Sequence, residues 1–305
     1  MKQTVGLPLA LLALVVGFGF ASEHFFSRDT FVAITNDIPA LMVMAVGMTY
    51  VLVIGGIDLS VGSVLALSSG LCAVAMQSWG WNIPGAMALG LACGVLAGSL
   101  NGLISVTWRV PSFIVTLGML EIARGGAYLI TDSRTQYIGS SIGGLGEPLW
   151  LGISPAFILA LAIVIAGDIY LRRSVLGRYM VGVGSNEEAM RLAGIDPRPL
   201  KVLVFALMGA LAALGGLMQI SRLEAADPNA GTGMELQVIA AVVIGGTSLM
   251  GGRGSVLSTF FGVLIVAVLE AGLAQAGVSD PVKRIVTGCV IVVAVLLDMY
   301  RHKQK

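Results

Sequence analysis

Ten stretches of the chain are long and almost uncharged, and short polar segments separate them. Between residues 38 and 107, Asp58 is the single charged side chain. A helix that crosses a bilayer needs about 20 mostly apolar residues, whereas the strands of a membrane barrel alternate apolar and polar positions. The pattern predicts about ten transmembrane helices, with broken or short helices near 54–62 and 236–255. The predicted spans are 5–20, 38–55, 58–77, 84–107, 112–131, 154–171, 200–219, 236–250, 255–276 and 282–300.

Composition agrees with an all-α polytopic membrane protein. Of the 305 residues, 56% are hydrophobic and 11% are charged, against about 25% charged in an average soluble domain. The mean hydropathy is +0.92. Because the net charge is only +1, we do not expect nucleic acid as a partner. The apolar composition makes membrane lipid the expected environment. We expect residues 1–305 to form a single transmembrane domain.

The distribution of Lys and Arg predicts the orientation. If the N-terminus is cytoplasmic, most of the 18 Lys and Arg fall on the cytoplasmic side, which is the usual bias. We therefore expect both termini inside. Residues 1–22 also fit a signal peptide, with Lys2, an apolar core and Gly19-Phe20-Ala21 before Ser22. We favour a retained first helix, because polytopic proteins rarely need a cleaved signal.

Glycines recur every fourth residue in one predicted helix. Gly90, Gly94, Gly98 and Gly102 share one helical face, which allows a neighbouring backbone to approach closely. Helix packing is the first interpretation, and a sliding or gating face is the alternative.

The longest polar segment, residues 172–201, is predicted to be a cytoplasmic loop that contains a short helix at about 185–194. Ser185 and Glu188 have the spacing of a capping box, and Gly194 offers a stop. Ala189, Leu192 and Ala193 share one face. So short a helix is unstable alone, so this face is either part of a connector or docks on a cytoplasmic partner.

The chain carries no phosphate-binding loop of the GxxxxGK[ST] type, because none of its five lysines follows a glycine. A pump built on it must therefore use the ATPase of another chain. Three cysteines in apolar spans and two isolated histidines do not have the spacing of a metal site, and no Ser/His/Asp constellation is visible. We expect no cofactor, no metal and no catalytic residue in this chain.

The few polar groups inside the predicted spans are candidates for function. Asp58 lies at a predicted break and is expected to cap the following helix, with contact to cargo as the alternative. Glu121 and Arg124 are three residues apart and can form an ion pair or line a pathway. Asn101 is a candidate interhelical hydrogen-bonder. An interior so poor in acids disfavours proton coupling and favours uncharged, weakly held cargo.

Two glycine-rich segments resemble each other. IGGIDLSVGSVL at 54–65 matches IGGTSLMGGRGSVL at 244–257 with two residues inserted. The pair is either an internal repeat, as in many transporters, or two turns that converged.

Longer stretches resemble the permease subunits of ABC importers for ribose, xylose, arabinose, rhamnose and related sugars. They are GGIDLSVGS (55–63), NGLISVTWRVPSFIVTLGML (101–120), GRYMVGVGSNEEAMRLAGI (177–195) and AGTGMELQVIAAVVIGGTSLMGGRGS (230–255). They cover much of the chain in the family's order.

The resemblance implies a multi-pass protein of the bacterial inner membrane that forms a sugar pathway with a second permease, identical or homologous. It also implies an ATP-binding subunit, which holds the ATP and magnesium, and a periplasmic sugar-binding protein. The helix at 185–194 would be the coupling helix that docks on the ATPase. Glu121 departs from the more apolar pattern expected around Arg124. The competing hypotheses are a secondary sugar carrier without an ATPase and a membrane-embedded enzyme.

Overall fold

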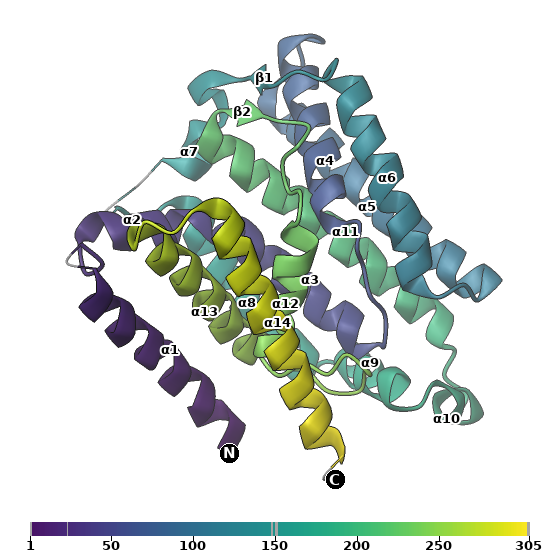
Figure 1. The fold of residues 1–305 in the computed structure, drawn as a ribbon. Coiled ribbons are helices and arrows are strands. Elements are labelled where there is room, and N and C mark those ends of the chain that lie inside the picture. Colours follow the sequence, from purple (N-terminus) through teal and green to yellow (C-terminus); the bar gives the residue numbers. More distant parts are fainter. Residues whose placement is uncertain (1, 23, 148, 150–151, 304–305) are drawn as a thin grey trace.

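The computed structural model describes residues 2–22, 24–147, 149 and 152–303 of the chain. Each of the ten predicted stretches is helical (Figure 1). They correspond to α1 (Lys2–Ala21), α3 (Pro39–Val53), α4 (Val61–Gln77), α5 (Ile83–Trp108), α6 (Ser112–Ile130), α8 (Pro155–Arg173), α11 (Pro197–Leu223), α12 (Met234–Ile244), α13 (Val256–Gln275) and α14 (Asp280–Lys303).

Five of these helices, α5, α6, α8, α11 and α13, are long and apolar enough to cross a membrane. A sixth span results if α2 (Arg28–Asp37) and α3, which bend by 43° at Ile38, are counted together. α4, α12 and residues 6–21 of α1 are apolar but shorter. The chain is thus an all-α polytopic membrane protein, while the number of ten spans stays a prediction.

Several short elements were not predicted. α2 begins after Ser27, whose hydroxyl accepts a hydrogen bond from the Thr30 amide at 3.2 Å. The predicted loop 172–201 is largely helical, with α9 (Val175–Ser185) and α10 (Glu187–Leu192). A 3-10 turn (Gly139–Ile142), α7 (Gly143–Gly146) and two strands complete the described part of the chain. The strands β1 (Gln136–Tyr137) and β2 (Ala225–Ala226) pair antiparallel, with Gln136 opposite Ala226.

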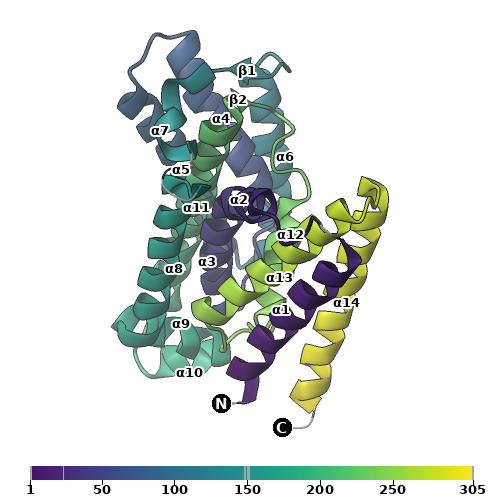
Figure 2. The ribbon, with the colours of Figure 1, turned by 90° about the vertical axis from the view of Figure 1, so that its left-hand side faces the viewer.

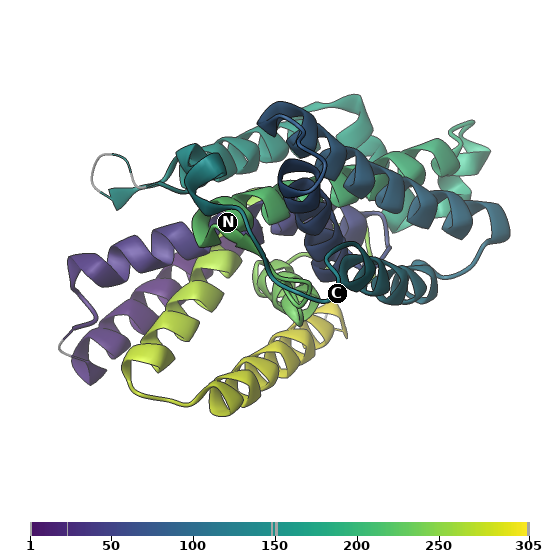
Figure 3. The ribbon, with the colours of Figure 1, turned by 90° about the horizontal axis from the view of Figure 1, so that it is seen from above.

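α3 is the centre of the molecule. All fifteen of its residues are buried, and it contacts α8, α11, α12 and α13. α14 runs along the lower edge in the view from above and contacts α12 and α13 (Figure 3). A helix that is apolar on every side suits a protein core or a bilayer interior, and the four helices around α3 place it in the core.

α5 and α11 are the most closely packed pair, and the predicted glycine face lies between them. A Cβ atom at Gly94 would overlap the Gly209 carbonyl, and one at Gly98 would overlap the Phe205 carbonyl. A Cβ at Gly209 would overlap the Gly94 carbonyl in turn. Gly90 faces α4 instead, where a Cβ would come 2.8 Å from the Ser68 carbonyl oxygen. Gly102 lies against Val202 of α11.

The two chain ends lie at the same end of the molecule as α9 and α10, and the paired strands lie at the opposite end (Figures 1 and 2). α1 runs along α13, with Phe18 packed against Gly272. α1 thus packs on α13 in this structure, while retention of the first helix stays a prediction.

Candidate functional site

A non-helical segment, residues 54–60, crosses the interior between α3 and α4. Gly55 adopts a left-handed conformation with φ of 76°, and the amides of Gly55 and Gly56 donate back to Leu52 and Val51 at 2.9 and 2.8 Å. These two bonds form the motif with which a glycine commonly ends a helix. We call residues 54–60 the first break. The predicted break near 54–62 is confirmed.

Two side chains of α6 hydrogen-bond the backbone of the first break. The Ile57 amide donates to the Ser112 hydroxyl at 2.9 Å, and the Leu59 amide donates to the Thr116 hydroxyl at 3.1 Å. Unpaired backbone groups at membrane depth are costly, so a non-helical segment there needs such partners. Sequence reasoning missed these two residues. Their four-residue spacing, which puts both hydroxyls on one helical face, was the available signal.

Asp58 lies fully inside the protein but does not cap α4 as predicted. Its Oδ1 accepts hydrogen bonds from the Ser60 amide at 2.8 Å and from the Ser60 hydroxyl at 2.6 Å. Ser60 is the residue at the cap position of α4, and its side chain makes no capping bond. The capping prediction is wrong because the carboxylate closes a local turn two residues long, one residue before the helix begins.

Asn101 links the first break to α5. Its Nδ2 donates to the Ser60 hydroxyl at 3.0 Å, and its Oδ1 is buried without a partner. Asp58, Ser60 and Asn101 thus form a buried polar chain, which we call the polar chain. The interhelical hydrogen bond expected of Asn101 is present.

A second break, residues 245–255, separates α12 from α13. Gly246 has φ of 86°, and the amides of Gly246 and Thr247 donate to Val243 and Val242 at 2.8 and 3.2 Å. The same helix-ending motif occurs at the first break, but the sequence match aligns Gly55 with Gly245, whereas the residue with positive φ here is Gly246. Ser255 then caps α13, whereas Ser63, its partner in the match, lies inside α4. The likeness therefore holds at the helix ends and fails beyond them.

The two breaks touch each other. The Gly252 amide donates to the Val53 carbonyl at 2.9 Å, and a Cβ at Gly251 would lie 3.1 Å from the Gly55 Cα. On the neighbouring turn, the hydroxyls of Thr49 and Thr259 are 2.9 Å apart. Segments about 200 residues apart in sequence thus meet at one buried junction.

The predicted ion pair between Glu121 and Arg124 is wrong. Glu121 is exposed, and the guanidinium of Arg124 donates to the carbonyls of Pro228 and Ala230 at 2.5 and 2.8 Å. These carbonyls belong to the glycine-rich loop 227–233, which lies beside α6 at this point. Arg124 holds that loop because carbonyl acceptors are nearer than the carboxylate one turn away.

The short helix of the polar segment is α10, and its start differs from the prediction. Asn186 is its cap, with Oδ1 accepting from the Ala189 amide at 2.9 Å. Ser185 ends α9, and its hydroxyl donates to the Val181 carbonyl. The helix ends as predicted at Gly194, where φ is 82°. Asn186 has the same capping chemistry as Ser185, and only the backbone path selects it.

α10 presents its predicted apolar face to the outside. Leu192 is 83% exposed, and Ala189 and Ala193 are exposed beside it. Met190 packs inward against Gly182, and Glu187 forms an ion pair with Lys201 of α11. The helix is therefore fastened to the protein on one side and open on the other.

Within the described residues, no three His, Cys, Asp or Glu side chains lie close enough together to hold a metal ion. The arrangement consists of buried breaks, hydroxyl and amide hydrogen bonds, and glycine contacts between helices. Such groups hold non-helical backbone inside the protein and fix how the helices pack.

These features define a multi-pass helical membrane protein, and comparison with known proteins shows its family. Residues 30–295 match the family described as branched-chain amino acid transport system / permease component, and the chain belongs to this family.

Named relatives cover nearly the whole chain. The ribose import permease protein of Escherichia coli K12 is 39% identical over 95% of this chain and 92% of its own length. The ribose import permease protein of Bacillus subtilis is 39% identical over 98% and 93%. The L-arabinose ABC transporter permease protein of Azospirillum brasilense is 31% identical over 98% and 88%. No solved structure matches this chain significantly.

Proposed function

We propose that this chain is the pathway-forming subunit of an ATP-driven importer for a monosaccharide, in the bacterial inner membrane. The observation that carries the proposal is near full-length similarity to permeases whose names specify import of ribose and arabinose. The family description names amino acid transport, so family membership alone does not fix the cargo.

The energy comes from a separate ATP-binding subunit that docks on α10. Ala189, Leu192 and Ala193 form an exposed apolar face on α10. Short amphipathic helices commonly dock such a face into a groove of a partner protein. α10 is the coupling helix in this proposal. Because Glu187 is paired with Lys201, a push on α10 acts directly on α11.

Three contacts then connect α10 with the first break. Lys201 belongs to α11, α11 packs on the glycines of α5, and Asn101 of α5 donates to Ser60. Close glycine packing lets α5 and α11 shift as rigid rods. Movement of α10 thus changes the position of the first break and switches access between the two sides of the membrane.

The remaining parts of the assembly follow from the same proposal. The chain has ten spans with both termini in the cytoplasm, which agrees with termini at the α10 end of the molecule (Figure 2). A second permease, a copy or a homologue, completes the pathway. A periplasmic sugar-binding protein delivers the sugar at the opposite end.

The test is a pull-down of the tagged full-length chain from gently solubilised membranes, with mass spectrometry of the captured proteins. Wild type is compared with Leu192→Asp, which places a charge on the proposed docking face. Leu149→Asp is the matched control, because Leu149 is also exposed but lies between α7 and α8, outside α10.

We expect an ATP-binding subunit to accompany wild type and Leu149→Asp, and to be reduced at least about tenfold with Leu192→Asp, as expected when a charge replaces an interface anchor. Capture of an ATPase by all three proteins would reject α10 as the docking helix. Absence of an ATPase from all three would favour the secondary carrier.

A further inference from the structure

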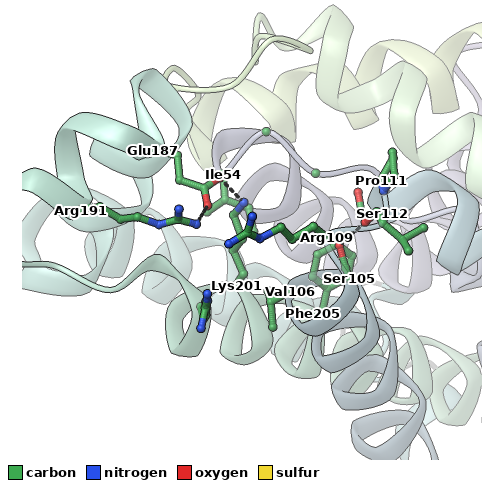
Figure 4. Close-up of a pocket in the computed structure, with 14 residues that line it drawn as sticks. Ile54, Ser105, Val106, Arg109, Pro111, Ser112, Glu187, Arg191, Lys201 and Phe205 are labelled. Atoms are coloured by element: carbon green, nitrogen blue, oxygen red, sulfur yellow. Dashed lines mark hydrogen bonds and ion pairs between the residues drawn. The ribbon is translucent and has the colours of Figure 1, made fainter.

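A basic cavity lies at the end of the molecule that carries α10, beside the first break. It has a volume of about 360 Å³, and its lining comes from the turn between α5 and α6, from α10 and from the start of α11. Four cationic side chains line it: Arg109, Arg191, Arg198 and Lys201. Glu187 is the single acidic side chain of the lining. Figure 4 shows the guanidinium of Arg109 pointing across the cavity towards Lys201 and Glu187.

The cations of this cavity exceed its internal acid. Glu187 is shared, since one oxygen accepts from Arg191 at 3.1 Å and the other from Lys201 at 2.5 Å. Among the ion pairs of the described residues, none involves Arg109 or Arg198. Like charges gathered in a recess repel each other unless an anion joins them. The cavity therefore fits an anionic group that accepts several charge-assisted hydrogen bonds, and phosphate matches the guanidinium fork in geometry.

The surface next to the cavity is apolar and indicates the source of that phosphate. Trp108 precedes Arg109 and is 68% exposed. Phe113 and Ile114, just beyond the turn, are also exposed, and so is Leu103, five residues before Trp108 in α5. Exposed tryptophan beside arginine is typical of the bilayer interface, where the ring lies at headgroup level. A phospholipid can contact the basic cavity with its phosphate and the exposed apolar side chains with its acyl chains. A free phosphate can contact only the cavity.

We propose that this cavity binds the phosphate of an anionic phospholipid headgroup, with the acyl chains lying on the exposed faces of α5 and α6. Basic pockets between membrane helices on the cytoplasmic side suit such headgroups. Because Arg191 is on α10, Arg198 on α11 and Arg109 at the end of α5, a bound headgroup joins the three helices. The lipid would thereby stabilise the position of α10 from which it engages its partner.

The test uses Trp108 as a reporter in the purified full-length chain, with Trp79, Trp81 and Trp150 replaced by Phe. Phosphatidylglycerol or phosphatidylcholine with the same brominated acyl chains is added in mild detergent, and quenching of Trp108 fluorescence is recorded. Arg109→Gln/Arg198→Gln removes two cavity cations. Arg173→Gln/Arg178→Gln is the matched control, because it removes two cations from the same end outside the cavity lining.

We expect phosphatidylglycerol to reach half-maximal quenching at an about fivefold lower mole fraction than phosphatidylcholine, in keeping with the attraction of a few cations for an anionic headgroup. This preference should disappear in Arg109→Gln/Arg198→Gln and persist in the control. Elution volume on size exclusion and the Trp108 emission maximum, unchanged in all variants, establish that the variants are folded.

Three outcomes would overturn the proposal. The first is equal quenching by both lipids in the wild-type cavity, and the second is a preference that survives loss of Arg109 and Arg198. In the third, millimolar glycerol 3-phosphate abolishes the preference, so that a soluble phosphate is the ligand. If the double variant instead loses ATPase capture and keeps its lipid preference, the cavity docks a protein. Quenching needs neither ATPase nor transport, so failure here leaves the proposed function untouched.

Discussion

Asp58 illustrates how a buried carboxylate is held by neutral partners. Its Oδ1 accepts both donors of Ser60, and Asn101 approaches the same serine from α5. The first break is non-helical, so each of its backbone amides needs a substitute partner, and Asp58, Ser112 and Thr116 provide three of them.

Two replacements of Asp58 distinguish the role of its hydrogen bonds from the role of its charge. We expect Asp58→Asn to retain assembly and most transport, because the amide oxygen can accept the bonds of Ser60. Asp58→Leu should lower the thermal midpoint in detergent and abolish transport, since each buried donor left unpaired costs about 1–3 kcal/mol. Thermal unfolding and uptake into proteoliposomes are the measurements. A normally folded Asp58→Asn protein without transport would show that the charge itself is needed.

Arg124 gives the second prediction at this scale. Arg124→Gln removes a charged donor from two loop carbonyls, and hydrogen bonds to charged groups contribute about 1.5–3 kcal/mol. We expect amide exchange in residues 227–233 to rise at least about tenfold, because that energy is one to two orders of magnitude in an opening equilibrium. Hydrogen exchange read by mass spectrometry measures it. Glu121→Gln, on the exposed face, should leave this exchange unchanged, and equal effects of the two variants would restore the ion pair hypothesis.

At the scale of elements, the contact of α5 with α11 depends on the absence of side chains. Gly98 sits against the Phe205 carbonyl and Gly94 against the Gly209 carbonyl, so the helices approach backbone to backbone. An added methyl group meets backbone there, and backbone cannot rotate away as a long side chain does.

We therefore expect Gly98→Ala to destabilise the protein by about 1–3 kcal/mol, the usual cost of overpacking. Gly118→Ala on α6 is the control, because a Cβ there has nothing within 4 Å. Since alanine is the better helix former, Gly118→Ala should be neutral or slightly stabilising. The measurement is the thermal midpoint of each variant in the same detergent, and we expect a lower midpoint for Gly98→Ala than for Gly118→Ala. Equal midpoints would contradict close helix packing as the role of Gly98.

At the scale of the whole molecule, the two breaks form one junction that joins α3 to α13. The bond from Gly252 to Val53 and the contact of Thr49 with Thr259 tie residues from opposite halves of the chain. Because α3 is buried throughout, it has no space to slide against α13. We infer that the two helices move as one body when the α10 end is pushed.

A disulfide across this junction tests the inference. In a background without Cys72, Cys93 and Cys289, Thr49→Cys/Thr259→Cys is oxidised and assayed for ATP-driven uptake with its partner subunits. We expect uptake within about twofold of the reduced form, because a link inside one rigid body restricts no domain motion. Each single-cysteine variant controls for the substitutions. Loss of uptake that a reductant restores would mean that α3 and α13 move apart during transport.

The sequence by itself determined what local chemistry controls. Apolar stretches of about 20 residues predict membrane helices, and all ten predicted stretches contain one. Nine of these helices lie within four residues of the expected ends, whereas α12 ends at Ile244, six residues before the predicted end. Gly194 ends a helix as predicted, and Gly55 ends α3 within the predicted break, because glycine adopts a positive φ without strain. The family resemblance was also readable, since its motifs lie in the chain in order.

Only the tertiary structure decided which partner each polar group takes. Asp58 accepts from Ser60 and does not cap a helix, Asn186 caps α10 in place of Ser185, and Arg124 donates to loop carbonyls rather than to Glu121. Ser112 and Thr116 gained their roles because the first break passes beside α6, which no local pattern encodes. Sequence spacing reports neighbours along one helix, whereas hydrogen bonds between segments depend on how the helices pack.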